Sequence, residues 1–202
     1  RKVSKRDRNS NPLIGDAATI TIVEKSMEPV VIHGLLKMDG TSADALMIPA
    51  GGFRLPASDD TRQMVEDEAG NFRSQDNLVM KGGEGFNFVQ REVPPMIENL
   101  LHVAGSSKDR VDWYMFHQPN RFMLHKLADK LGIPREKMPS NIVENFGNAS
   151  GATIPTNIGF NLGDRLMREQ YVFCLAGFGV GLTWGALLLN IGNLSFNEII
   201  YY

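Results

Sequence analysis

Residues 112–155 read DWYMFHQPNRFMLHKLADKLGIPREKMPSNIVENFGNASGATIP, and the order of apolar and polar segments there organises the rest of the chain. Two apolar segments in this stretch end in a polar residue just before a new helix is expected: His117 after 111–116, and Asn148 after 142–147. In layered sheets, functional groups gather where strands end and helices begin. We therefore predict that His117 and Asn148 face one substrate.

The segments around these two residues alternate between strand and helix patterns. We expect a strand over 111–116, a helix that has Pro119 near its start and stops at Gly132, a short strand at 142–143, and an apolar helix over 149–162. Such alternation is typical of an α/β protein with a layered, mixed sheet.

The uncharged run YVFCLAGFGVGLTWGALLLNIG, residues 171–192, is long enough to cross a bilayer. Three glycines in its middle, Gly177, Gly179 and Gly181, divide it into two runs of strand length. Strands buried on both faces of a sheet have this uninterrupted apolar character. We predict two core strands joined by a glycine turn, and no membrane span.

The first half of the chain is less regular. Strands are expected at 17–23, 30–36 and 45–48, followed by a loop-rich excursion over 49–77 with a brief helix at 61–68. A helix then follows Gly83 and ends at Gly105, with a kink or interruption expected at Pro94-Pro95.

Bulk properties exclude several classes of protein. A net charge of −2 argues against nucleic-acid binding, and a single cysteine excludes an internal disulfide framework and fits a reducing, cytoplasmic compartment. His117 and His125 are eight residues apart with no cysteine cluster nearby, so no metal site is predicted. The chain does not begin with Met, shows no signal peptide, and reads over residues 1–13 as a linker from something longer.

Taken singly, the three polar loops leave structural interpretations open. A lone histidine at a strand end is more often structural than catalytic, and an asparagine before a helix most often caps it. The Gly-x-Gly-x-Gly turn at 177–181 is weak as a dinucleotide fingerprint, because a strand-like Leu182-Thr183-Trp184 follows it.

Together, the loops make the sequence resemble the β-ketoacyl-acyl-carrier-protein synthase III family of the thiolase superfamily. The matching motifs are Gly15-Asp16-Ala17-Ala18, Met80-Lys81-Gly82, Asp112-Trp113, His117-Gln118-Pro119-Asn120, Gly147-Asn148-Ala149-Ser150 and the run from Gly177 to Gly185. The match is most specific from about residue 80 onward and covers the second half of the family's length. The resemblance implies a thiolase-like layered fold, with helices on both faces of a mixed sheet and residues 1–202 forming the C-terminal domain of a two-domain enzyme.

The resemblance also implies roles for individual residues. His117 and Asn148 match the catalytic His and Asn of a Cys–His–Asn triad, and both side chains offer N–H donors for a developing enolate. The backbone N–H of Val180 matches the oxyanion hole for the acyl oxygen, although most of the family has Gly there. Positions that line the pantetheine and acyl tunnel are matched by Gly82, Phe86, Asn120, Ser150 and Phe178.

The family's nucleophilic cysteine has no match among residues 1–202. The one cysteine, Cys174, falls inside an expected core strand, where we assign it a structural role. We therefore expect the isolated domain to be unable to form an acyl-enzyme.

The resemblance implies a decarboxylative Claisen condensation of an acyl-coenzyme A with malonyl-acyl carrier protein. It implies no cofactor beyond these thioester substrates, and as partners acyl-CoA, acyl carrier protein, the N-terminal half of the same enzyme and, at full length, a second copy. Two alternatives stay open: an acyltransferase or other thioester enzyme of the superfamily, and a non-catalytic domain that binds acyl thioesters.

Overall fold

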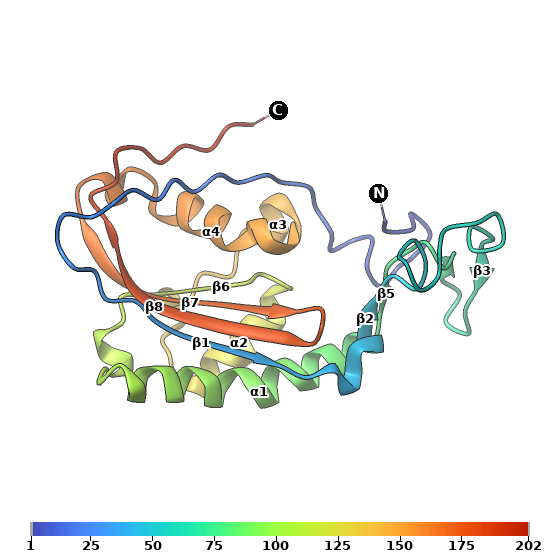
Figure 1. The fold of residues 1–202 in the computed structure, drawn as a ribbon, viewed down its shortest axis with the longest axis horizontal. Helices are drawn as coiled ribbons and strands as arrows, with labels where there is room; N and C mark the ends of the chain where they lie inside the picture. Colours follow the sequence, from blue (N-terminus) through green and yellow to red (C-terminus); the bar gives the residue numbers. More distant parts are fainter. Residues whose placement is uncertain (1, 202) are drawn as a thin grey trace.

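The computed structural model describes residues 2–201, and Figure 1 shows them as a sheet with helices on both faces. The α-helices and strands follow the order β1 His33–Met38, β2 Leu46–Met47, β3 Val65–Glu66, β4 Phe72–Arg73, β5 Val79–Met80, α1 Gly82–Val103, β6 Trp113–Phe116, α2 Arg121–Leu131, α3 Ile142–Phe146, α4 Thr153–Leu162, β7 Gln170–Gly179 and β8 Thr183–Gly192. Short 3-10 helices lie at Gly40–Ala45, Lys108–Arg110, Arg135–Lys137, Ser150–Ala152 and Gly163–Met167.

The central sheet has the strand order β1-β8-β7-β6. Strands β7 and β8 form a long antiparallel pair, β6 runs parallel to β7, and β1 runs antiparallel to β8. The predicted pair of core strands joined at residues 180–182 is therefore confirmed, as is the mixed α/β class.

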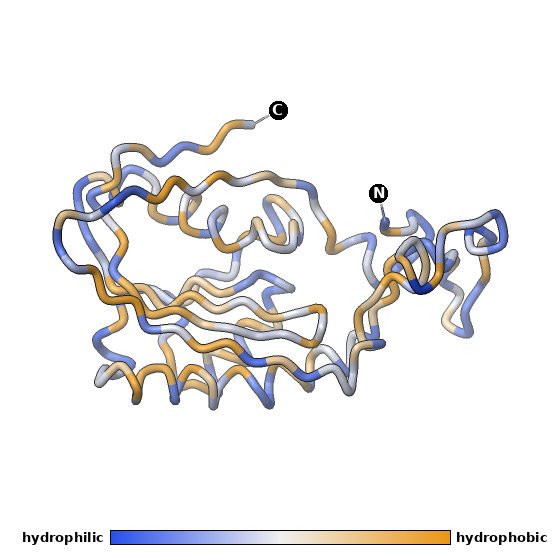
Figure 2. Tube along the Cα trace, viewed as in Figure 1, coloured by the Kyte–Doolittle hydropathy of each residue, from blue (hydrophilic) through white to orange (hydrophobic). Residues whose placement is uncertain are grey.

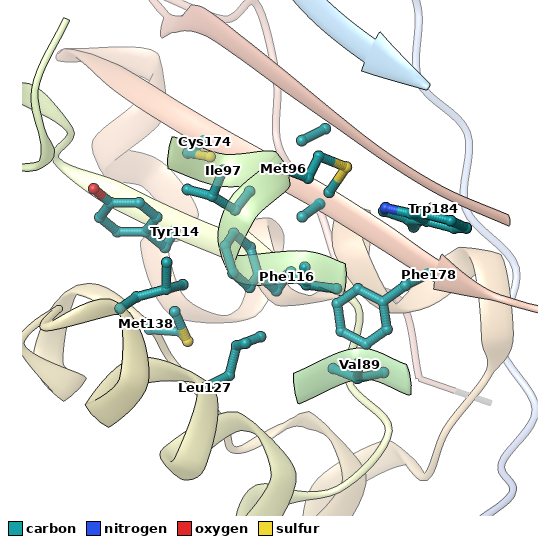
Figure 3. Close-up of a cluster of buried hydrophobic side chains, with 14 of the residues drawn as sticks. Val89, Met96, Ile97, Tyr114, Phe116, Leu127, Met138, Cys174, Phe178 and Trp184 are labelled. Atoms are coloured by element: carbon teal, nitrogen blue, oxygen red, sulfur yellow. The ribbon is translucent and has the colours of Figure 1, made fainter. Parts of the chain in front are cut away.

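Strand β7 is largely covered on both faces, which explains its unbroken apolar run, whereas β8 is more open on one face, where Leu187 is 42% exposed. Alternate residues of β7 point to opposite faces: Cys174 and Phe178 join the large core under α1 and α2, while Phe173 joins a smaller cluster under α4. Figure 3 shows the large core, where Phe116, Phe178 and Trp184 of the sheet meet side chains of the two helices.

Helix α1 runs without interruption through Pro94 and Pro95, so the expected interruption is wrong. Proline removes backbone donors from the helix, but apolar side chains on both sides of the pair hold this helix on the sheet. Val93, Met96 and Ile97 are completely buried there. Tertiary packing therefore outweighs the local preference.

Two short elements differ from the sequence expectation. The strand predicted at 142–143 is instead the start of helix α3, whose Ile142 is buried and whose end at Gly147 has a φ of 71°. The brief helix expected at 61–68 is also wrong, since Val65–Glu66 pairs with Phe72–Arg73 as a small antiparallel ladder. An apolar run of two or three residues is too short to distinguish a strand from a helix.

The segment 15–32 is extended and forms no strand, so the strand predicted at 17–23 is wrong. Ile20 and Val23 are each 87% exposed, because this segment passes over α3 and α4 on the side away from the sheet (Figures 1 and 2). The strand predicted at 30–36 is confirmed in part, as β1 begins at His33.

Residues 2–8 pack against the excursion at 49–77 and the residue that follows it. The Ser4 hydroxyl donates to the Phe72 carbonyl at 2.6 Å, and the Leu78 N–H donates to the Lys2 carbonyl at 2.7 Å. Asp7, whose side chain is fully buried, pairs with Arg73 at 2.6 Å between Oδ2 and Nε. Over residues 2–201, none of the helices is long and apolar enough to cross a membrane.

Candidate functional site

His117 lies immediately after β6, and its backbone N–H donates to the Ala176 carbonyl of β7 at 2.8 Å. Its ring packs edge-on against Phe178, with centroids 5.5 Å apart, and its Nδ1 lies 2.7 Å from the Thr153 hydroxyl. Burial lowers the pKa of His117 to about 4, against a smaller opposing effect of the Ser150 carbonyl. The imidazole is therefore neutral at neutral pH.

Asn148 is held by backbone hydrogen bonds to a distant part of the chain. Its N–H donates to the Leu13 carbonyl at 2.6 Å, and its carbonyl accepts from the Gly15 N–H at 3.2 Å. The side-chain Oδ1 accepts from the Ser150 N–H at 2.9 Å, which directs the carboxamide oxygen toward its own loop and leaves the NH₂ end at the opposite side. A positioned N–H donor of this kind suits stabilisation of an oxyanion.

Two residues connect His117 with Asn148. The Thr153 hydroxyl contacts His117 Nδ1 and donates to the Ser150 carbonyl at 2.9 Å, while the Ser150 N–H bonds the Asn148 side chain. Ser150 has a φ of 54°, which directs its N–H and carbonyl to these two different partners. One turn of chain therefore orients both candidate catalytic side chains.

Two glycines permit the close approach that supports Asn148. A Cβ atom at Gly15 would lie 1.9 Å from the Phe146 carbonyl oxygen, and one at Gly147 would lie 2.6 Å from the Gly15 Cα. A pocket of about 320 Å³ adjoins this contact, lined by residues that include Ile14, Asp16, Asn148 and Ser150. The loop thus presents Asn148 at the edge of an open space.

The other predicted site residues lie at the end of β7, in the turn that follows it, and at or near the starts of α1 and α2. Phe178 is buried against His117, and Val180 is 61% exposed in the turn that follows. Gly82 begins α1, and Phe86 stacks on Phe122 of α2 with centroids 5.7 Å apart. Asn120 is the N-cap of α2 and accepts from the Met123 N–H at 2.8 Å, so its side-chain oxygen has a structural partner.

Thr153 and Leu13 were missed by sequence reasoning. Thr153 is completely buried at the first position of α4, and nothing in its neighbours separates it from an ordinary helix residue. Leu13 acts through its backbone carbonyl, which no side-chain pattern can indicate.

Cys174 lies deep in the large core, as the sequence predicted for a structural cysteine. Its side chain is inaccessible, and burial raises the pKa of the thiol to about 12. A reactive cysteine needs a lowered pKa and access to solvent. Across residues 2–201, no three His, Cys, Asp or Glu side chains gather closely enough to hold a metal ion.

Comparisons with known proteins identify the family of the chain. Residues 101–191 match the family model described as 3-oxoacyl-[acyl-carrier-protein (ACP)] synthase III C terminal. The chain is 36% identical over 184 residues to the β-ketoacyl-[acyl-carrier-protein] synthase III of Synechococcus sp., an alignment that covers 91% of this chain and 52% of that protein. The Porphyra umbilicalis enzyme of the same name is 33% identical, with 91% and 54% covered.

A solved structure gives the same relation in three dimensions. The 3-oxoacyl-(acyl-carrier protein) synthase from Burkholderia xenovorans LB400 superposes with a TM-score of 0.86 at 39% identity, covering 98% of this chain and 54% of the other. The chain thus spans about half the length of the curated relatives it matches. It belongs to the β-ketoacyl-[acyl-carrier-protein] synthase III family and corresponds to the C-terminal half of the family's thiolase-like fold.

Proposed function

We propose that this chain supplies the His–Asn part of the active site of a condensing enzyme. The reaction is the decarboxylative Claisen condensation of an acyl thioester with malonyl-acyl carrier protein, which yields a β-ketoacyl-acyl carrier protein. The observation that carries the proposal is the linked placement of His117 and Asn148 through Thr153 and Ser150. A structural histidine and a plain N-cap would have no need of a shared support.

In the proposed chemistry, the C–C bond to the malonyl carboxylate breaks, carbon dioxide leaves, and the electron pair passes to the enolate of the thioester. N–H groups of His117 and Asn148 donate to the enolate oxygen, as an oxyanion hole does. The enolate carbon then attacks the acyl carbonyl, a C–C bond forms, the C–S bond to the enzyme breaks, and the released thiolate takes up a proton.

The acyl oxygen would be held by the backbone N–H of Val180 in the exposed turn between β7 and β8. Gly82, Phe86, Asn120, Ser150 and Phe178 are proposed to line the path of the pantetheine arm and acyl chain. Phe86 supports this role because it packs partly buried against the core that also contains Phe178, at the ends of α1 and β7.

The nucleophile is proposed to come from outside residues 1–202. Cys174 is the one cysteine of these residues, and its burial and raised pKa unsuit it for attack on a thioester. Acyl-CoA, acyl carrier protein and the N-terminal half of a synthase are accordingly the proposed partners. By the same reasoning, residues 1–202 alone do not form an acyl-enzyme.

The test is release of labelled carbon dioxide from malonyl-acyl carrier protein. It compares residues 1–202 alone, the same residues joined to the N-terminal half of a family synthase, and the joined form carrying His117→Ala. His125→Ala is the matched control, since His125 lies on α2 and its ring contacts Ser140 instead.

The proposal expects turnover and β-ketoacyl product from the joined form and from His125→Ala, and loss in His117→Ala. Acyl-thioester binding without turnover in every form would refute condensation and favour an acyltransferase or a binding domain.

A further inference from the structure

The hydroxyl of Thr153 lies among three polar groups in a fully buried position. It is 2.7 Å from His117 Nδ1, 3.3 Å from the Gln118 backbone nitrogen and 2.9 Å from the Ser150 carbonyl oxygen. A threonine hydroxyl has one proton to donate and two lone pairs to accept with. The three neighbours therefore compete for a fixed number of hydrogen bonds.

Two of these neighbours have only one possible role. The Gln118 N–H can only donate to the hydroxyl, and the Ser150 carbonyl can only accept from it. The hydroxyl proton then points to Ser150, and one lone pair remains for His117. All three contacts are satisfied only when Nδ1 of His117 carries a proton.

The alternative arrangement loses a hydrogen bond. If the hydroxyl donated to an unprotonated Nδ1, the Ser150 carbonyl would lose its bond from the Thr153 hydroxyl and keep only the one from the Thr153 backbone N–H. The arrangement that keeps all three contacts of the hydroxyl therefore has one more hydrogen bond and is the more stable one. Because burial keeps the ring neutral, only one of its two nitrogens holds a proton.

We propose that Thr153 is a positioning residue that holds the neutral His117 ring in its Nδ1-protonated form, so that Nε2 presents a lone pair to the site at rest. The geometric basis is the three-way contact of the buried hydroxyl.

The consequence for catalysis rests on the proposed function. At rest, Nε2 accepts a proton, which suits activation of an incoming thiol. Donation to the enolate oxygen instead requires the single ring proton to reside on Nε2. The Nδ1 proton then passes to water and a proton from water binds Nε2, while the Thr153 hydroxyl turns about the Cβ–Oγ1 bond and donates to Nδ1.

The experiment is nuclear magnetic resonance of residues 1–202 labelled with ¹⁵N at histidine, recorded at neutral pH. Correlations from the ring nitrogens to the ring C–H protons identify which nitrogen of His117 is protonated. Thr153→Val keeps the side-chain shape and removes the hydroxyl, and Thr153→Ser restores it. His125, whose Nε2 contacts the Ser140 hydroxyl at 3.0 Å, is an internal control in every spectrum.

We expect the parent chain and Thr153→Ser to hold the proton on Nδ1. In Thr153→Val, the ratio of the two tautomers should move about fivefold toward Nε2, as expected for loss of one hydrogen bond, while His125 stays unchanged. A parent ring protonated on Nε2, or an unchanged ratio in Thr153→Val, overturns the inference. If Thr153→Val fails to fold, the parent spectrum alone still decides the tautomer.

This result is independent of turnover. An Nδ1-protonated ring in a chain whose joined form never condenses would support the role of Thr153 and refute the proposed function. A ring protonated on Nε2 in a chain whose joined form does condense would refute the role of Thr153 and support the proposed function.

Discussion

Replacing Asp7 with Asn should loosen the N-terminal segment that supports Asn148. The Asp7 carboxylate is fully buried and accepts hydrogen bonds from Arg73 Nε at 2.6 Å, the Ser10 hydroxyl at 2.7 Å and the Asn9 N–H at 2.8 Å. The substitution removes the charge while keeping the size, so the Arg73 guanidinium, only 14% exposed, loses one of its two carboxylate partners.

The magnitude follows from the titration of the carboxyl group. Burial by itself raises the pKa of Asp7, but the hydrogen bond from Arg73, with those from Ser10 and Asn9, lowers it from 3.8 to about 2. A depression of that size corresponds to about 2 kcal/mol of stabilisation by the ionised group. Breaking a buried ion pair typically costs about 3–5 kcal/mol. Because Arg73 keeps its bond to Asp67, the expected loss is about 2 kcal/mol.

The pH dependence has a definite sign. Because the folded-state pKa is depressed, the contribution of Asp7 is complete above about pH 4 and is lost as the pH falls toward about 2. In Asp7→Asn, this loss of stability on acidification should be missing.

Amide hydrogen exchange measures the effect where it occurs. The Asn148 N–H bonds the Leu13 carbonyl, so opening of residues 2–14 exposes it. A loss of about 2 kcal/mol should speed its exchange about 30-fold at neutral pH. The control is Asp59→Asn, because Asp59 is fully exposed in its pair with Arg62 and should show no measurable change. Equal exchange at Asn148 in both variants would refute the reasoning.

Three further outcomes are expected. Gly15→Ala should destabilise the chain by about 1–3 kcal/mol in urea unfolding, because its Cβ would overlap the Phe146 carbonyl oxygen; an unchanged midpoint would contradict the close contact. Cys174 should resist thiol reagents until the chain unfolds, since burial raises its pKa to about 12; rapid labelling of the native chain would contradict its place in the core. Desolvation of the partly buried imidazole lowers the pKa of His117 to about 4, so stability should fall as the pH drops from about 6.5 to about 4, and His117→Gln should lack this fall; identical pH profiles would disprove it.

The central sheet could be predicted from the sequence because its strands have a strong physical signature. The uncharged run at 171–192 has no charged face to turn to solvent, and the glycines in its middle give the position of the turn. Helix α2 was equally clear, since Pro119 stands near its start and Gly132, with a φ of 65°, ends it. The residues of these elements themselves indicate where each one begins and ends.

The secondary structure of the wrongly predicted segments depends on contacts with other parts of the chain. The β-branched run at 17–23 has the pattern of a strand, but a strand also needs a hydrogen-bonded partner, and none pairs with it within residues 2–201. The pair Ile142-Val143 has too few residues to show a period, and it opens helix α3 with Ile142 buried. Local pattern could not settle either case.

In the candidate site, the functional side chains could be predicted from the sequence, but the groups that orient them could not. His117 and Asn148 could be selected because a polar residue at the end of an apolar run is conspicuous. Their orientation comes from groups that carry no such signal: a buried threonine hydroxyl, a serine backbone, and the carbonyl of Leu13. The Leu13 contact joins residues 135 positions apart through a glycine pair that admits no Cβ. The irregular segment 2–15 is therefore part of the site's framework, and its stability should set how firmly Asn148 is held.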